Sequence, residues 1–305
     1  MNQKISIWKE SGHYISYGPF AHQIFVKELG TSTASSDKTL LLIHGFPESS
    51  FSYHLVINEL MSVFDRIVLF DFIGYGLSNK PTDDFTYSLF EQTDVLLTVW
   101  HHFGVKGGHM LSHDMGDSVA TEVIARHCNN LMPIWLSDGL KSVTLTNGSM
   151  VLDLADLRIT QKILLSKWGS YFKNIISFSI FKKQIISAHG NDNLKDEEIA
   201  LLWEFNLFQD GHKKTYLTIK YLNDRKRFEK TRWLPALNKC DLPIHLCWGS
   251  DDKVARVEMA EYLKLNICTN AELTIMKGVG HFCQIGSPEI WVESILNYYK
   301  KVSPL

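Results

Sequence analysis

Residues 109–124 read HMLSHDMGDSVATEVI. The first letters form a short apolar run typical of a buried strand, and the last ones have the spacing of an amphipathic helix. Between them, Ser112 and Gly116 are small enough to let the chain turn sharply, so the side chain of Asp114 should project from the end of the strand. An aspartate at such a turn either caps the helix that follows or acts as a nucleophile.

Other apolar runs of strand length lie on both sides of this turn, and helical patterns separate them. The expected strands are residues 39–43, 66–72, 109–111, 140–146, 243–248 and 271–276, with an antiparallel hairpin of residues 14–17 and 24–28 at one edge. This alternation is typical of a mostly parallel sheet with helices on both faces. We therefore predict an α/β protein with a doubly wound sheet.

The segment between the fourth and fifth of these runs, residues 149–242, has few strand-like patterns. Its expected helices are residues 152–165, 171–186, 195–208 and 213–227. Helices inserted between two strands of a sheet are typical of a cap. We interpret the chain as a core made of residues 1–148 and 243–305 with a helical cap domain at 149–242.

The bulk composition excludes several classes of protein. The net charge of -2 over 305 residues gives no electrostatic reason to expect a nucleic-acid partner. The five cysteines include no CxxC pair, so we expect reduced thiols rather than a disulfide framework or a zinc site. We expect no metal or cofactor.

The N-terminal residues lack the apolar core of a signal peptide, and no apolar run is long enough to span a bilayer. We therefore expect a cytoplasmic protein. Residues 175–186, IISFSIFKKQII, are apolar enough either to pack within the cap or to touch a membrane surface.

Polar residues that follow other strands are candidates for the same site as Asp114, because ligands bind beyond the carboxyl ends of parallel strands. His281 follows the last strand in a glycine-rich turn, and Asp252 or its neighbour Asp251 follows the strand before it. A carboxylate there can hold the imidazole in one tautomer and stabilise its charged form. Asp153, after the fourth strand, is a weaker candidate for the acid.

An oxyanion formed at this site needs backbone N–H donors. One should come from Met115, directly after the candidate nucleophile, and one from the loop after the first parallel strand. In that loop, His44-Gly45-Phe46-Pro47, we expect the N–H group of Phe46 to be the donor.

These motifs together resemble the epoxide hydrolase and haloalkane dehalogenase branch of the α/β-hydrolase fold. The resemblance rests on the Asp114 turn, on Asp252 and His281, and on HGFPES at 44–49 and DFIGYGLS at 71–78. Within that branch, LSHDMGD at 111–117 and YLNDRKRF at 221–228 are most similar to the mesoderm-specific transcript subgroup.

The resemblance implies a hydrolase that forms a covalent ester between Asp114 and a small hydrophobic substrate and then hydrolyses it with water. Haloalkane dehalogenases usually hold the halide with a Trp after the nucleophile and an Asn or a second Trp. The first two of these positions are Met115 and Phe46 here, and neither side chain donates a hydrogen bond. Epoxide opening is therefore favoured, with dehalogenation or β-lactone opening as alternatives, and a ligand-binding relative with little turnover as another.

Epoxide hydrolases use cap tyrosines to protonate the epoxide oxygen. The resemblance makes Tyr221 the candidate, although it could equally be an amphipathic tyrosine that packs the cap. A second tyrosine would be Tyr171 or Tyr216. We expect Tyr221 and His113 to contact the substrate.

Overall fold

The computed structural model describes residues 2–155, 159–174 and 176–302. Within these residues, an eight-stranded sheet has the order β1-β2-β4-β3-β5-β6-β7-β8. The strands are β1 (His13–Tyr17), β2 (His22–Gly30), β3 (Thr39–Ile43), β4 (Arg66–Phe70), β5 (Gly107–His113), β6 (Gly139–Thr146), β7 (Ile244–Gly249) and β8 (Glu272–Met276). The pair β1–β2 is antiparallel, as predicted for the hairpin, and the sheet is mostly parallel, as predicted; β2–β4 is also antiparallel.

The central strands are buried at every position, which explains why they appear in the sequence as continuous apolar runs. Strand β5 is longer than the predicted residues 109–111. It extends over Ser112 and His113, whose polar side chains contact Asp117 and Glu48 inside the protein. A polar side chain that finds a buried partner does not end a strand.

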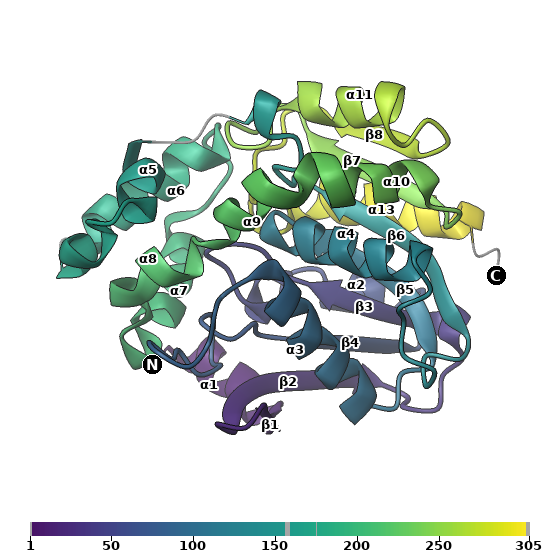
Figure 1. Ribbon diagram of the computed structural model, residues 1–305, viewed down its shortest axis with the longest axis horizontal. Helices are drawn as coiled ribbons and strands as arrows, with labels where there is room; N and C mark the ends of the chain where they lie inside the picture. The colour runs from purple at the N-terminus through teal and green to yellow at the C-terminus, as the bar shows by residue number, and fades with distance from the viewer. Residues whose placement is uncertain (1, 156–158, 175, 303–305) are drawn as a thin grey trace.

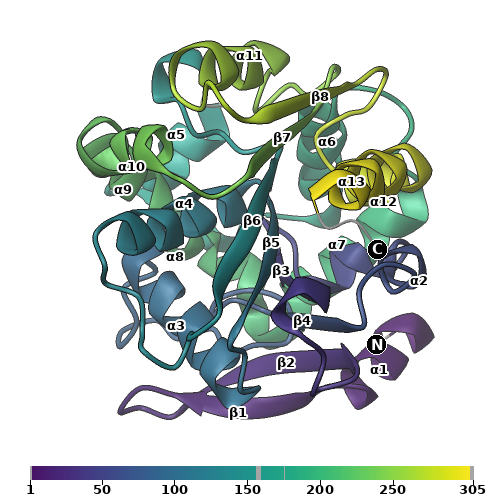
Figure 2. The same cartoon turned by 90° about the vertical axis from the view of Figure 1, so that its right-hand side faces the viewer.

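Helices cover both faces of the sheet (Figure 2). One face packs against α3 (Leu89–His102), α4 (Met115–Cys128), α10 (Leu234–Lys239) and α11 (Val257–Asn266). The other packs against α1 (Gln3–Glu10), α2 (Ile57–Leu60) and α13 (Pro288–Val302), with the short α12 (Cys283–Gly286) before α13. The doubly wound α/β architecture is thus confirmed.

The segment between β6 and β7 contains the helices α5 (Ile159–Leu165), α6 (Phe178–His189), α7 (Asp196–Leu207), α8 (Thr215–Thr218), α9 (Tyr221–Phe228) and α10. Figure 1 shows α5 to α8 grouped at one end of the sheet. None of the helices in the described part of the chain is long and apolar enough to cross a membrane.

Three of the four predicted helices of this segment differ from the structure. Residues 152–154 form a 3-10 turn before α5, and residues 156–158 of the predicted helix lie outside the described residues. The next predicted helix begins only at Phe178, because the Ser177 side chain accepts a hydrogen bond from the N–H of Ile180 and caps α6 there; residue 175 lies outside the described residues.

The predicted helix 213–227 is divided into α8 and α9. The hydroxyl of Tyr75, from the core, donates a hydrogen bond of 3.1 Å to the carbonyl of Thr218 at the end of α8. The last carbonyl groups of a helix have no hydrogen-bond partner within the helix, and here a residue of the core supplies one. The contact is invisible in the local sequence, so the break could not be predicted.

The last part of the segment is tied to α4 through the buried carboxylate of Glu122. That carboxylate accepts hydrogen bonds from Arg232 at 2.7 and 2.8 Å and from the indole N–H of Trp233 at 2.9 Å. Arg126, one turn along α4, donates a further bond of 3.0 Å. The helix that begins at the candidate nucleophile is therefore fixed to the inserted segment, and we call this group the Glu122 cluster.

Candidate active site

The turn between β5 and α4 holds Asp114 in a strained backbone conformation, with φ of 49° and ψ of -112°. Positive φ is uncommon for residues other than glycine and persists only where the surroundings fix it. The Asp114 N–H donates to the carbonyl of Thr146 on the next strand. A Cβ atom at Gly116 would lie 2.6 Å from the carbonyl oxygen of His44, so the turn requires glycine there.

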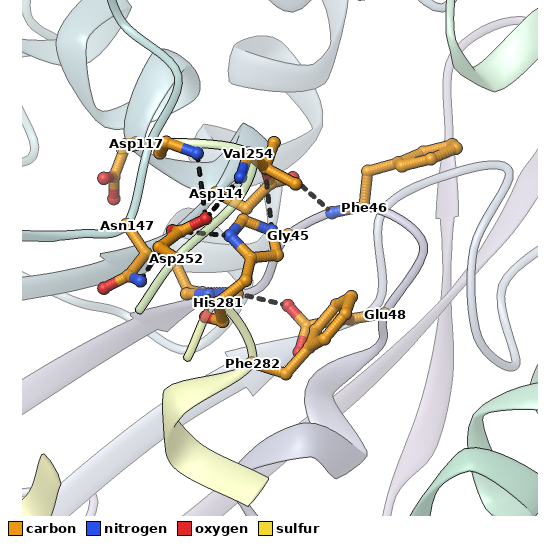
Figure 3. Close-up of polar contacts among 12 residues, drawn as sticks. Gly45, Phe46, Glu48, Asp114, Asp117, Asn147, Asp252, Val254, His281 and Phe282 are labelled. Atoms are coloured by element: carbon orange, nitrogen blue, oxygen red, sulfur yellow. Dashed lines mark hydrogen bonds and ion pairs between the residues drawn. The ribbon is translucent and has the colours of Figure 1, made fainter. Parts of the chain in front are cut away.

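The Asp114 side chain makes no capping hydrogen bond to α4, which excludes the simpler interpretation of this residue as a helix cap. Its Oδ1 instead accepts a hydrogen bond of 2.9 Å from the backbone N–H of Phe46. Its Oδ2 lies 3.6 Å from Nε2 of His281. The two carboxylate oxygens therefore have different partners (Figure 3).

His281 connects Asp114 to a second carboxylate. Nδ1 of His281 lies 2.8 Å from Oδ2 of Asp252, and an ionised carboxylate only accepts, so Nδ1 carries the proton. This leaves Nε2 directed at Asp114. All three side chains are almost completely buried, each with an exposed fraction of 4% or less.

Asp252 is held by several donors besides His281. Its Oδ1 accepts from the N–H groups of Val254 and Ala255, at 2.6 and 2.9 Å, and its Oδ2 accepts from the amide of Asn147 at 2.7 Å. Asn147 also accepts from the N–H of Gly249 at the end of β7. These bonds fix the carboxylate that orients the imidazole.

The two competing acids lie elsewhere. Asp251 accepts from Ser250 and Asn191, and these hydrogen bonds, Asn191 first, lower its pKa from the ordinary value. Asp153 forms an exposed ion pair with Lys230. Of the three candidate acids, only Asp252 contacts His281.

Of the two predicted N–H donors, that of Phe46 contacts the Asp114 carboxylate, and that of Met115 follows Asp114 directly in the chain. The loop that carries Phe46 approaches so closely that a Cβ atom at Gly45 would lie 2.6 Å from the Cβ of Asp114. The N–H of Met115 is the first of α4 and has no partner within the helix. The Met115 side chain is buried, and its sulfur lies 3.1 Å from the hydroxyl oxygen of Tyr75.

A cavity of about 260 Å³ lies over Asp114 and His281. Its wall is largely apolar and comes from the inserted helices, including Ile163, Leu164, Phe181, Ile185 and Ile219. Tyr221 and Asn206 are among the polar residues that line it. A pocket of this kind takes a ligand that is mostly apolar with few polar atoms.

Tyr221 is the only tyrosine of the described residues that lines this cavity. Burial and the nearby charge of Asp114 raise its pKa, and Arg225 opposes them. Tyr171 is 73% exposed and packs against Trp168, and Tyr216 is half-buried against the core. Neither supplies the expected second tyrosine.

The structure argues against the predicted contact of His113 with substrate, because its side chain is fully buried and does not line the cavity. Its Nδ1 lies 2.6 Å from Glu48 and its Nε2 lies 2.8 Å from the backbone carbonyl of His281. Burial alone would lower the pKa of His113, but Glu48 raises it well above the ordinary value. The protonated His113 therefore donates to the backbone carbonyl of His281 and fixes the position of that loop.

Two residues of the site were missed from the sequence. Glu48 of the HGFPES motif accepts from His113 and from Gln284, so the motif itself was the available signal. Arg225 is buried, donates to Ser118 at 2.7 Å and to the Asp114 carbonyl at 3.4 Å, and lies 4.8 Å from the centre of the Tyr221 ring. Its position in YLNDRKRF, among exposed charges, gave no sign of burial.

No cluster of three or more metal-ligating side chains occurs in the part of the chain that the structure describes. The arrangement brings together a carboxylate, a histidine, a second carboxylate and oxyanion donors under an apolar pocket. Such a site can perform nucleophilic catalysis followed by hydrolysis.

Comparison with known proteins gives the same fold. A family model described as "alpha/beta hydrolase fold" matches residues 38–288. The "Putative hydrolase LipZ" of Mycobacterium tuberculosis is 33% identical over 294 residues, which cover 95% of this chain and 96% of the relative. The mouse mesoderm-specific transcript protein is 28% identical, with 95% and 86% coverage, and epoxide hydrolase 1 of Caenorhabditis elegans is 24% identical, with 88% and 67%.

Among solved structures, a haloalkane dehalogenase loop variant from Bradyrhizobium elkanii superposes with a TM-score of 0.75 at 18% identity, covering 96% of this chain and 97% of that one. At this identity the likeness shows the fold alone. The relatives confirm the resemblance that the sequence motifs indicated.

Proposed function

Because the chain belongs to the α/β-hydrolase fold family and is a hydrolase, we propose that it opens a hydrophobic epoxide through a covalent ester on Asp114. His281 and Asp252 complete the catalytic triad in this proposal. The observation that carries it is the hydrogen bond from the Phe46 N–H to Oδ1 of Asp114. The oxyanion donor points at the aspartate itself, as it must if the ester carbonyl belongs to the enzyme.

In the first step, Oδ2 of Asp114 attacks a saturated carbon of the epoxide, and the bond from that carbon to the ring oxygen breaks. Oδ2 is the oxygen directed toward His281, while Oδ1 stays with Phe46. Tyr221, which lines the same cavity, gives its proton to the departing alkoxide. The positive charge of Arg225 over the tyrosine ring stabilises the phenolate that remains.

In the second step, Nε2 of His281 takes a proton from a water molecule, and the resulting hydroxide attacks Cγ of the ester. Negative charge collects on Oδ1 of Asp114, where the N–H groups of Phe46 and Met115 stabilise it. Loss of one such donor costs about 3 kcal/mol in transition-state stabilisation. The bond from Cγ to Oδ2 then breaks, Oδ2 takes the proton back from the imidazolium that Asp252 has stabilised, and the diol leaves. The proton of the new Asp114 carboxyl group passes to the phenolate of Tyr221, which restores the enzyme.

Dehalogenation is the second candidate, because the same triad would serve it. The side chains of Met115 and Phe46 next to Asp114 offer no hydrogen bond to a departing halide. Tyr221 in the cavity wall offers a proton donor, which an epoxide needs and a halide does not.

The test is intact-protein mass spectrometry of the His281→Gln variant with a panel of epoxides, haloalkanes and β-lactones. We expect a stable adduct on Asp114 that carries the full mass of an epoxide, and a loss of steady-state turnover of at least about 10²-fold. Asp114→Asn is the matched control and should form no adduct. The Tyr221→Phe/His281→Gln double variant should form the epoxide adduct far more slowly than His281→Gln does.

An adduct with the mass of a haloalkane minus one hydrogen halide would instead indicate dehalogenation. Normal turnover by His281→Gln, or an adduct on another residue, would overturn the proposed mechanism. Failure of every compound to react would contradict the substrate classes proposed.

A further inference from the structure

We infer that the exposed face formed by α5, by α6 and by the 3-10 helix Gly169–Asn174 with the preceding Trp168 docks on the surface of a bilayer that contains anionic lipids, and that an apolar substrate enters the cavity from there. The docking does not depend on the proposed chemistry, whereas the delivery of substrate rests on it. Figure 1 shows α5 and α6 at the periphery of the molecule, away from the central strands.

The face carries several exposed apolar side chains close together in the sequence. They are Trp168 and Tyr171, which are 55% and 73% exposed, and Ile180 and Ile186 of α6, each 38% exposed. The rings of Trp168 and Tyr171 lie 5.6 Å apart and form one aromatic surface. Trp and Tyr are the residues that favour the boundary between lipid headgroups and acyl chains, since each combines an apolar ring with a polar group.

The charge of this region is opposite to that of the whole chain. Residues 159–191 contain five lysines and neither Asp nor Glu, whereas the chain has a net charge of -2. Lys162, Lys167 and Lys183 are exposed, and Lys182 is paired with Asp196. Lysines beside apolar side chains are the combination that binds a peripheral protein to an anionic lipid surface.

The positive charge of the face also favours a bilayer over a second copy of the chain as the partner of this face. A symmetric dimer through this face would bring the same lysines of two chains together, and like charges across an interface repel. An anionic bilayer complements both the lysines and the apolar rings.

The face is continuous with the cavity. Ile180 is exposed on α6 and also lines the cavity, so the pocket opens at this face. The inner sides of the two helices continue the apolar wall with Leu164, Phe181 and Ile185 toward Asp114. A ligand leaving the bilayer here would therefore remain in apolar surroundings until it reaches the carboxylate.

The experiment is co-sedimentation of the full-length protein with phosphatidylcholine vesicles prepared with and without phosphatidylserine. We expect binding only with phosphatidylserine, and weaker binding as salt rises. The double variants Trp168→Ser/Tyr171→Ser and Lys167→Glu/Lys183→Glu should each bind at least about tenfold more weakly. The control Ile134→Ser/Leu265→Ser removes side chains that are 97% and 74% exposed elsewhere and should bind as the wild type does.

A second readout places the contact. Brominated lipids should quench part of the tryptophan emission of the wild type, and the Trp168→Phe variant should lose that part. All variants should keep the circular dichroism spectrum and the melting temperature of the wild type, which shows that they fold and separates this test from that of the chemistry.

Equal binding by wild type and both face variants would overturn the inference, as would the absence of any preference for phosphatidylserine. Dimerisation in solution that Trp168→Ser/Tyr171→Ser abolishes would overturn it too, and would assign the face to a second copy.

Discussion

The two oxygens of the Asp114 carboxylate lead to a prediction about isotopes. Oδ1 is bonded to Phe46 and Oδ2 faces His281, so in the proposed mechanism Oδ2 leaves with the product and water replaces it. A single turnover in ¹⁸O-water should therefore label the peptide that contains Asp114 and leave the diol unlabelled. Mass spectrometry of the digested protein and of the product measures both. A labelled diol in the first turnover would mean that water attacks the substrate directly.

Asp117, in the first turn of α4, is fully buried. Its Oδ1 accepts from the hydroxyl of Ser112 at 2.6 Å and from the N–H of Thr146 at 3.1 Å. Its Oδ2 has no hydrogen-bond partner among the described residues. Burial raises the pKa of Asp117 to about 8, so the carboxyl group is largely neutral near pH 7.

We predict that Asp117→Asn stabilises the protein and that the gain grows with pH. The carboxyl group of the unfolded chain ionises near the ordinary aspartate pKa of 3.8, whereas the folded one keeps its proton up to about 8. The unfolded state therefore binds fewer protons between these values, and the wild type loses free energy of unfolding as pH rises from about 4 to about 8. Each pKa unit corresponds to about 1.4 kcal/mol.

Asparagine does not titrate, and its carbonyl oxygen can still accept from Ser112 and Thr146. Urea unfolding of both proteins at about pH 5 and about pH 8 measures the difference in free energy. A gain that is independent of pH, or that shrinks as pH rises, would contradict the raised pKa.

At the scale of the helix, the Glu122 cluster is the main polar link between α4 and the inserted segment. Glu122 is completely buried, and its removal would leave Arg232 and the indole of Trp233 without their shared acceptor. We predict that Glu122→Ala lowers the free energy of unfolding by about 3–5 kcal/mol. Asp94→Ala is the control, because it removes a half-exposed partner of Arg126 and should cost less than about 1 kcal/mol.

Chemical denaturation of the two variants compares these costs directly. Similar costs would show that the buried cluster contributes no more than a surface pair. Circular dichroism should show that both variants keep the helical content of the wild type.

Elements also differ in how well their sequence predicts them. The central strands β3, β4 and β7 are buried continuous apolar runs, so their positions follow from the order of apolar residues along the sequence, to within one or two residues at each end. The boundaries of the inserted helices depend on contacts with distant residues, such as Tyr75 with Thr218, and those contacts leave no local signal.

The same contrast applies to the site. Asp114, Asp252 and His281 follow strand ends, and the geometry of a parallel sheet brings them together as expected. His113 and Arg225 were misjudged or missed because their roles depend on which way each side chain points. His113 was expected in the pocket, but its side chain contacts the backbone of His281 instead. Arg225 is surrounded in the sequence by exposed charged residues, but its side chain is buried against the ring of Tyr221.

At the scale of the molecule, the cavity lies between the inserted helices and the carboxyl end of the sheet. Its wall is largely apolar, so the free energy of binding should improve with the length of an apolar chain on the epoxide. We predict a gain of about 0.8 kcal/mol per methylene group, roughly fourfold in kcat/KM, until the cavity is filled. Steady-state kinetics with a series of terminal epoxides measures this, and a flat series would contradict an apolar binding mode.

The order of the site residues along the chain has a consequence for newly synthesised protein. Phe46 and Asp114 precede the inserted helices, and Asp252 and His281 follow them. At about 5 to 20 residues per second, translation from Asp114 to His281 takes roughly ten to thirty seconds. During that interval the nascent chain contains Asp114 but not His281, which is needed to hydrolyse an ester formed on Asp114. On the proposed mechanism, turnover begins only after β8 and the loop that follows it have left the ribosome.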